Sequence, residues 1–141
     1  IQFQPTVLAL TQELYTNYPT EVIPRKLYAH QLMKQNRANE AVRVLLFKLP
    51  SFKNNSDYYY LLASGYIRIG EIKRANMVYL KLISTDSTNP KYWLGVALTS
   101  QMLGDTYNAL SGYQHALQYA DPVWPAINFI NKQIARIKTN G

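Results

Sequence analysis

Apolar side chains recur along this chain at the spacing of one face of an α-helix. Across one stretch they fall three, four, seven and ten positions after the first, at Tyr59, Leu62, Ala63, Tyr66 and Ile69. A second stretch of the same kind, 72–82, follows directly after Gly70. Positions so spaced share one side of a helix, and Gly ends a helix easily because it adopts the left-handed conformation at little cost. The pattern therefore predicts two amphipathic helices joined by a short turn.

This helix pair occurs three times with a fixed period. The predicted turn residues Asn36, Gly70 and Gly104 are each separated by 34 residues. The same step relates four further sets of positions: Ala29, Ala63 and Ala97; Ala41, Ala75 and Ala109; Leu45, Tyr79 and Tyr113; Tyr59 and Trp93. A period of this length is typical of helical repeat proteins, in which each unit buries its apolar face against its neighbours. The recurring alanines predict the points at which two helices approach closely.

The repeats give the whole chain one architecture. We expect an all-α fold in a single domain, 1–141, with three helix-turn-helix repeats at 22–55, 56–89 and 90–123. A helix over 6–18 has the pattern of the second helix of a further repeat, so we expect the sequence to be a piece of a longer chain. A helix over 124–138 carries one apolar stripe and one polar face, as a helix that caps the last repeat must.

The residues of the repeat also carry a family resemblance. Tyr59-x-x-Leu62-Ala63-x-x-Tyr66, then Gly70, then Ala75-x-x-x-Tyr79 resembles the tetratricopeptide repeat (TPR), and Trp93-x-x-Val96-Ala97, Gly104 and Ala109-x-x-x-Tyr113 repeat it. The first repeat departs from the pattern, with Arg25 in place of the opening aromatic residue. The resemblance implies a right-handed TPR superhelix (an α-solenoid) whose first helices line a concave groove that binds partners.

Helical position then predicts which residues face such a groove. They are Lys26, His30, Met33, Lys34, Tyr60, Ser64, Ile67, Arg68, Lys91, Leu94, Leu98 and Gln101. This set is mixed apolar and basic with no acidic member, and Asp57 lies at its edge. It suits an extended or helical peptide that carries aliphatic anchors and a carboxylate or acidic side chains. The alternative is that the surface is solvated or covered by a segment of the protein itself.

One known TPR binding mode can be compared residue by residue. TPR domains that hold the C-terminal tails of heat-shock chaperones resemble one another in a two-carboxylate clamp of Lys, Asn, Asn, Lys and Arg. The equivalent positions here are Lys26, His30, Leu61, Lys91 and Gly95. Only the two lysines match, so the resemblance does not extend to that clamp.

The charge balance leaves a second functional class open. Fifteen basic and eight acidic residues give a net charge of +7, which attracts nucleic acid or anionic surfaces. The basic residues form no tract, and no RNA-binding motif is present. A basic repeat module for RNA or anionic surfaces is therefore the alternative to a protein-binding scaffold, and a solvated basic surface needs no partner at all.

Catalytic chemistry has no support in the sequence. Its two histidines, His30 and His115, are far apart and lie in no metal-binding motif. The glycines form no phosphate-binding loop, and the carboxylates are dispersed. We therefore expect no enzyme activity, no small-molecule substrate, no cofactor and no metal. We expect His115, beside the predicted core residue Ala116, to be solvated.

A narrower resemblance suggests a biological setting. The stretches 59–70, 89–98 and 109–117 resemble the C-terminal TPR region of the MshN family, which serves biogenesis of MSHA-type (type IV-like) pili. The resemblance implies a scaffold in the bacterial periplasm, tethered to the inner membrane through an N-terminal segment that this sequence lacks; without it, the cytoplasm is expected. The unpaired helix over 6–18 also predicts homo-oligomers.

Overall fold

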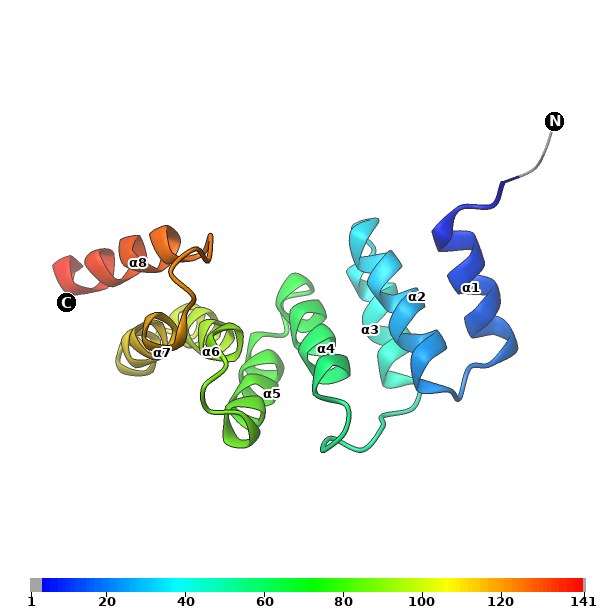
Figure 1. Cartoon of the computed structure of the whole chain (residues 1–141), viewed down its shortest axis with the longest axis horizontal. Coiled ribbons are helices and arrows are strands. Elements are labelled where there is room, and N and C mark those ends of the chain that lie inside the picture. The colour runs from blue at the N-terminus through cyan, green and yellow to red at the C-terminus, as the bar shows by residue number, and fades with distance from the viewer. Residues whose placement is uncertain (1–3, 141) are drawn as a thin grey trace. The chain divides into compact units, whose positions relative to one another are not determined.

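The computed structural model describes residues 4–140, and every regular secondary-structure element in this part of the chain is an α-helix (Figure 1). Its helices are α1 (Val7–Asn17), α2 (Val22–Lys34), α3 (Ala38–Leu46), α4 (Ser56–Arg68), α5 (Ile72–Thr85), α6 (Pro90–Met102), α7 (Thr106–Tyr119) and α8 (Ile127–Asn140). The chain divides into two compact units, the first ending at Gly70 and the second beginning at Glu71. The predicted all-α fold is confirmed.

The turns inside the repeats depend on left-handed residues, as the sequence predicts. Asn36, Gly70 and Gly104 have φ angles of 59°, 84° and 80°. At Gly104 the backbone N–H groups of the turn bond back to the end of α6, and Asp105 N–H reaches the Ser100 carbonyl at 2.9 Å. These bonds satisfy carbonyl groups that the end of a helix leaves without partners.

Small residues mark the helix crossings. The six alanines of the 34-residue pattern, Ala29, Ala41, Ala63, Ala75, Ala97 and Ala109, are all 0% exposed. The approach between α6 and α7 is closer still, because a Cβ added at Gly112 would lie 2.9 Å from the Ala97 Cβ. Larger side chains at the crossings of α2 with α3 and of α6 with α7 would push those helices apart.

In the first unit, neighbouring helices pack in chain order. Helix α1 lies against α2, where the Tyr15 and Tyr28 rings stack with centroids 5.5 Å apart. Helix α2 contacts both α3 and α4, and α3 also contacts α4. The first helices of the two repeats in this unit, α2 and α4, are therefore neighbours.

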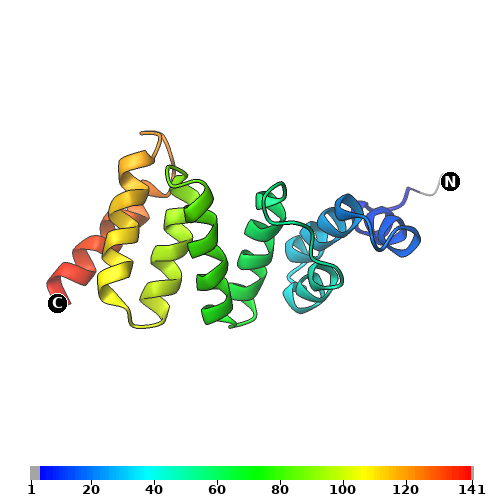
Figure 2. The same cartoon turned by 90° about the horizontal axis from the view of Figure 1, so that it is seen from below.

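In the second unit, α5, α6 and α7 lie side by side (Figure 2), and α8 covers the end of the stack. The fully buried residues Ala97, Tyr113 and Ile130 belong to one cluster, against which Ile134 and Ile137 pack. The apolar stripe of α8 thus buries the apolar surface that α7 would otherwise expose.

A polar tie recurs at the position that opens each repeat. The residues at this position are Arg25, Tyr59 and Trp93, each 34 residues after the one before. Each donates a hydrogen bond to a carbonyl in the preceding loop: Arg25 Nη1 to Pro19 at 3.2 Å, the Tyr59 hydroxyl to Pro50 at 2.7 Å, and Trp93 Nε1 to Ser87 at 2.7 Å. The tie fixes the loop that leads into each first helix.

The close crossing at Ala109 yields a stability prediction. Ala109→Leu should lower the free energy of unfolding by about 1–3 kcal/mol, because the added atoms have no space at a fully buried crossing. Chemical denaturation followed by circular dichroism measures the change. Ala135→Leu, on the exposed side of α8, is the matched control and should change little. Equal effects of the two substitutions would contradict the crossing.

Candidate partner-binding surface

The first unit brings eight of the predicted groove residues onto two neighbouring helices. Helix α2 carries Lys26, His30, Met33 and Lys34, and helix α4 carries Tyr60, Ser64, Ile67 and Arg68. We call these eight residues the α2/α4 face. Its side chains range from exposed at His30 and Lys34 to buried at Met33, which is 5% exposed. The face therefore offers side chains from both helices to a partner.

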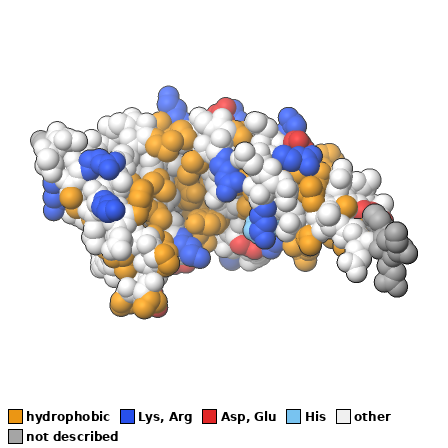
Figure 3. Space-filling model, turned by 90° about the horizontal axis from the view of Figure 1, so that it is seen from above, with side chains coloured by type: hydrophobic (Ala, Val, Ile, Leu, Met, Phe, Trp, Pro, Cys, Tyr) orange, Lys and Arg blue, Asp and Glu red, His pale blue; other side chains and the backbone are white. Residues whose placement is uncertain are grey.

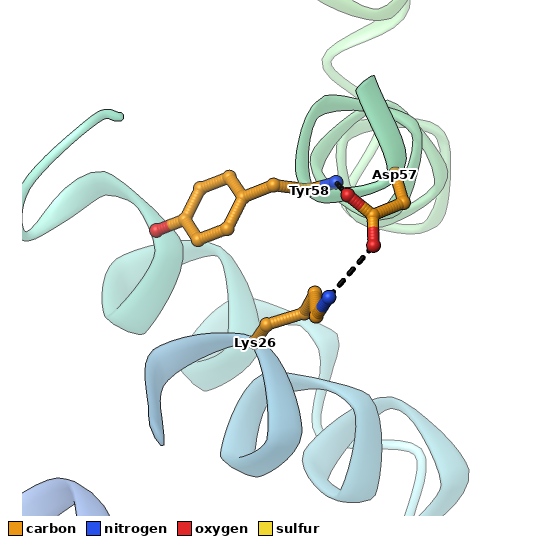
Figure 4. Close-up of polar contacts among 3 residues, drawn as sticks. All are labelled: Lys26, Asp57 and Tyr58. Carbon is orange, nitrogen blue, oxygen red and sulfur yellow. Dashed lines mark hydrogen bonds and ion pairs between the residues drawn. The ribbon is translucent and has the colours of Figure 1, made fainter. Parts of the chain in front are cut away.

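One end of the α2/α4 face holds an ion pair, which Figure 4 shows. Lys26 Nζ lies 2.7 Å from Asp57 Oδ2, and Asp57 Oδ1 accepts the Tyr58 backbone N–H at 2.9 Å. The hydrogen bond from Lys26 is the main reason why the pKa of Asp57 lies below its ordinary value. The charge of Lys26, which the sequence presents as part of a basic surface, is compensated within the protein.

The other end of the α2/α4 face, where α2 and α4 end, carries the cations Lys34 and Arg68. Arg68 Nη1 donates a hydrogen bond of 2.7 Å to the backbone carbonyl of Met33, near the end of α2. Lys34 follows Met33 in the chain and is exposed. Among residues 4–140, no carboxylate forms an ion pair with Lys34 or Arg68. This end of the face therefore keeps its positive charge.

Sequence reasoning missed the part played by Arg25, which is only 1% exposed. Its Nε donates to the Tyr58 hydroxyl at 3.0 Å, and its Nη2 donates to the Lys48 carbonyl at 2.6 Å. The Tyr58 hydroxyl in turn donates to the Leu45 carbonyl at 2.5 Å. Burial raises the pKa of Tyr58, against the opposing effect of Arg25.

This network joins α2, the loop after α3 and the first turn of α4. It therefore holds the beginning of α4, and with it Asp57, against α2. The one sequence signal for it is that arginine stands in the first repeat where the other repeats have an aromatic residue.

In the second unit the four predicted groove residues all lie on α6. Leu94 packs against the core cluster, so its side chain is only partly available. Gln101 Nε2 donates to Gln133 Oε1 of α8 at 3.1 Å, and Gln101 Oε1 accepts the Tyr113 hydroxyl at 2.5 Å. Burial raises the pKa of Tyr113 to about 12. Gln101 thus ties three helices together as well as lining the surface.

Two of these α6 residues also border hollows. Lys91 lies at a hollow of about 330 Å³ with the mainly apolar residues Pro90, Asp121, Val123, Trp124 and Pro125. Gln101 lies at a smaller one of about 220 Å³ with Thr106, Arg136, Ile137 and Asn140. Both hollows are open to the solvent.

The expectation that His115 is solvated was wrong. Its ring is half-buried and stacks on Trp93, with centroids 4.1 Å apart and planes 15° from parallel. Its Nδ1 lies 2.7 Å from the Ser111 carbonyl, so this nitrogen carries the proton and donates. His115 therefore helps to hold α7 on α6.

The positive charge of the chain is not gathered in one patch on the face drawn in Figure 3, where Lys and Arg side chains are scattered between hydrophobic ones.

Within the described residues, no group of three or more His, Asp or Glu side chains could hold a metal ion. None of the helices in that part of the chain has the length and apolar character needed to cross a membrane.

Comparison with known proteins supports the fold. No protein-family model matches the sequence, and no curated protein matches it. Two crystal structures of MamA match, and both matches cover 94% of this chain. The first has a TM-score of 0.79 at 14% identity and covers 75% of the MamA chain. The second has a TM-score of 0.80 at 15% identity and covers 70% of the MamA chain. PcrH, in complex with the chaperone-binding region of PopD, matches with a TM-score of 0.70 at 16% identity, over 99% of this chain and 98% of PcrH.

These solved structures are TPR-type helical repeat proteins, so the predicted TPR fold class is confirmed.

The buried Arg25 network yields a prediction about stability. Arg25→Met should lower the free energy of unfolding by about 2–4 kcal/mol, because the buried Tyr58 hydroxyl and the part-buried Pro19 and Lys48 carbonyls lose their donor. Lys26→Met, at the next position, removes only an exposed ion pair and should cost ~0–1 kcal/mol. Urea denaturation of both variants measures the difference. If the two substitutions lower the free energy of unfolding equally, the stabilising role of the Arg25 network is contradicted.

Proposed function

We propose that this protein is a non-catalytic scaffold that binds a peptide or helix of a partner protein along the first helices of its repeats. The observation that carries the proposal is the α2/α4 face, where the half-buried side chains of Tyr60 and Ile67 lie on the same helix as the unpaired cation Arg68. Partly exposed apolar side chains beside oriented charges are what a protein groove needs to hold a segment of another chain. PcrH, which has a similar fold, is seen in complex with a region of PopD.

We further propose that the partner belongs to bacterial envelope machinery, such as type IV-like pilus biogenesis or secretion. The support is the resemblance of 59–70, 89–98 and 109–117 to the MshN family. In this proposal the protein works in the periplasm, held at the inner membrane. Its role is to keep assembly components together.

Site-specific photo-crosslinking in the source organism tests the proposal. Ile67 on the α2/α4 face is replaced by p-benzoylphenylalanine, and the matched control carries it at Leu46, an exposed apolar residue of α3. We expect crosslinks from position 67 to envelope assembly proteins, identified by mass spectrometry, and few from position 46. Equal crosslinking from both positions would remove the α2/α4 face as the binding site.

The same experiment separates the rival function, an RNA or anionic-surface module. In a lysate of the same cells, nuclease treatment or a rise from low to physiological salt before irradiation should leave crosslinking from position 67 largely unchanged, because apolar contacts lose little in salt. Binding through phosphate contacts would fall steeply over that range. Loss of crosslinks under either treatment would favour the rival.

A further inference from the structure

The charges of the α2/α4 face are distributed unequally along its helices. At the beginning of α4, Asp57 compensates Lys26. Arg68 ends the same helix, eleven residues later and about 16 Å along the axis at 1.5 Å per residue. Asp57 is therefore too far away to compensate the cations at the other end, and a ligand carboxylate placed near Lys26 would meet the charge of Asp57.

Arg68 is already held in place at that second end. One of its five N–H donors is bound to the Met33 carbonyl at 2.7 Å, which fixes the guanidinium beside the end of α2. The remaining donors form no hydrogen bond within the described residues. A guanidinium with a fixed position loses less conformational entropy when it binds a carboxylate, and it can do so through two parallel hydrogen bonds.

Lys34 adds a second charge at the end of α2 to which Arg68 is bound. It follows Met33 directly, is exposed and has no ion-pair partner among residues 4–140. The acidic residue nearest to it in the sequence, Glu40, is held by Arg37 through contacts of 2.6 and 3.1 Å. Among the described residues, no carboxylate forms an ion pair with Lys34 or Arg68, so both charges are available to a ligand.

We propose that Lys34 and Arg68 form a subsite for an aspartate or glutamate side chain of the partner segment, with Ile67 beside it as the contact for an aliphatic residue. This inference rests on the proposed function and sharpens it, because it places the acidic group of the partner at the C-terminal ends of α2 and α4. The subsite lies apart from Lys26 and Lys91, the two positions that match the chaperone-tail clamp.

Selection from a phage-displayed library of random peptides tests the subsite. The baits are the full chain, its Lys34→Glu variant and the matched control Arg43→Glu, which makes the same charge change on an exposed residue of α3. We expect peptides selected on the wild type and on Arg43→Glu to carry an acidic residue at a fixed spacing from an aliphatic one. On Lys34→Glu that preference should disappear.

The strongest selected peptide then serves as a defined probe, in its acidic form and with Asp→Asn or Glu→Gln at the selected position. Fluorescence anisotropy should show that the neutral form binds the wild type about tenfold more weakly or worse. The ratio of the dissociation constants of the neutral and acidic peptides should fall to near one on Lys34→Glu. On Arg68→Lys, which keeps the charge but loses the planar guanidinium, the ratio should take an intermediate value. Circular dichroism confirms that each variant is folded, and Lys34→Gln replaces Lys34→Glu if that variant is not.

The outcomes separate the two proposals. Selected peptides without an acidic preference, or with the same preference on Lys34→Glu, would overturn the subsite and leave the proposed function standing. Failure to select any peptide on the wild type would overturn both. If Lys34→Glu lowers stability but leaves the affinity for the acidic probe unchanged, Lys34 only stabilises the end of α2, and the subsite is overturned.

Discussion

The structure depends on the close approach of neighbouring helices at small residues. Six alanines, in two sets of three that each repeat every 34 residues, are fully buried, and at Gly112 even a methyl group would press on α6. Within each unit, the helices that cross so closely, α2 with α3 and α6 with α7, are joined by tight turns at the left-handed Asn36 and Gly104. The side of each first helix that is not used for these crossings remains available, and on α2 and α4 it carries the candidate binding surface.

The polar tie at the opening of each repeat explains how an arginine can replace an aromatic residue. Arg25, Tyr59 and Trp93 differ in shape and charge, yet each donates a hydrogen bond to the loop before its helix. Arg25 has further donors, and it uses them to bind the Tyr58 hydroxyl and the Lys48 carbonyl. The departure from the repeat pattern thus adds a buried network that holds α4 against α2.

The sequence predicted the helices, the turns and the buried alanines, because these follow from local periodicity and from the conformational preference of Gly and Asn. The residues of the candidate surface remain a prediction from helical position, and the structure places eight of them on α2 and α4. The sequence could not show that Asp57 compensates Lys26, that Arg68 bonds to the Met33 carbonyl, or that His115 stacks on Trp93. Those contacts join residues on different helices, and their rotamers depend on how the helices pack.

The central claim is that the α2/α4 face holds the partner segment. The most direct measurement is a ¹⁵N–¹H NMR titration of the full chain with a synthetic peptide of the partner region found by crosslinking. The account predicts chemical-shift changes concentrated in the amides of 26–34 and 60–68. Changes confined to α3, or spread evenly over the chain without saturation, would contradict it.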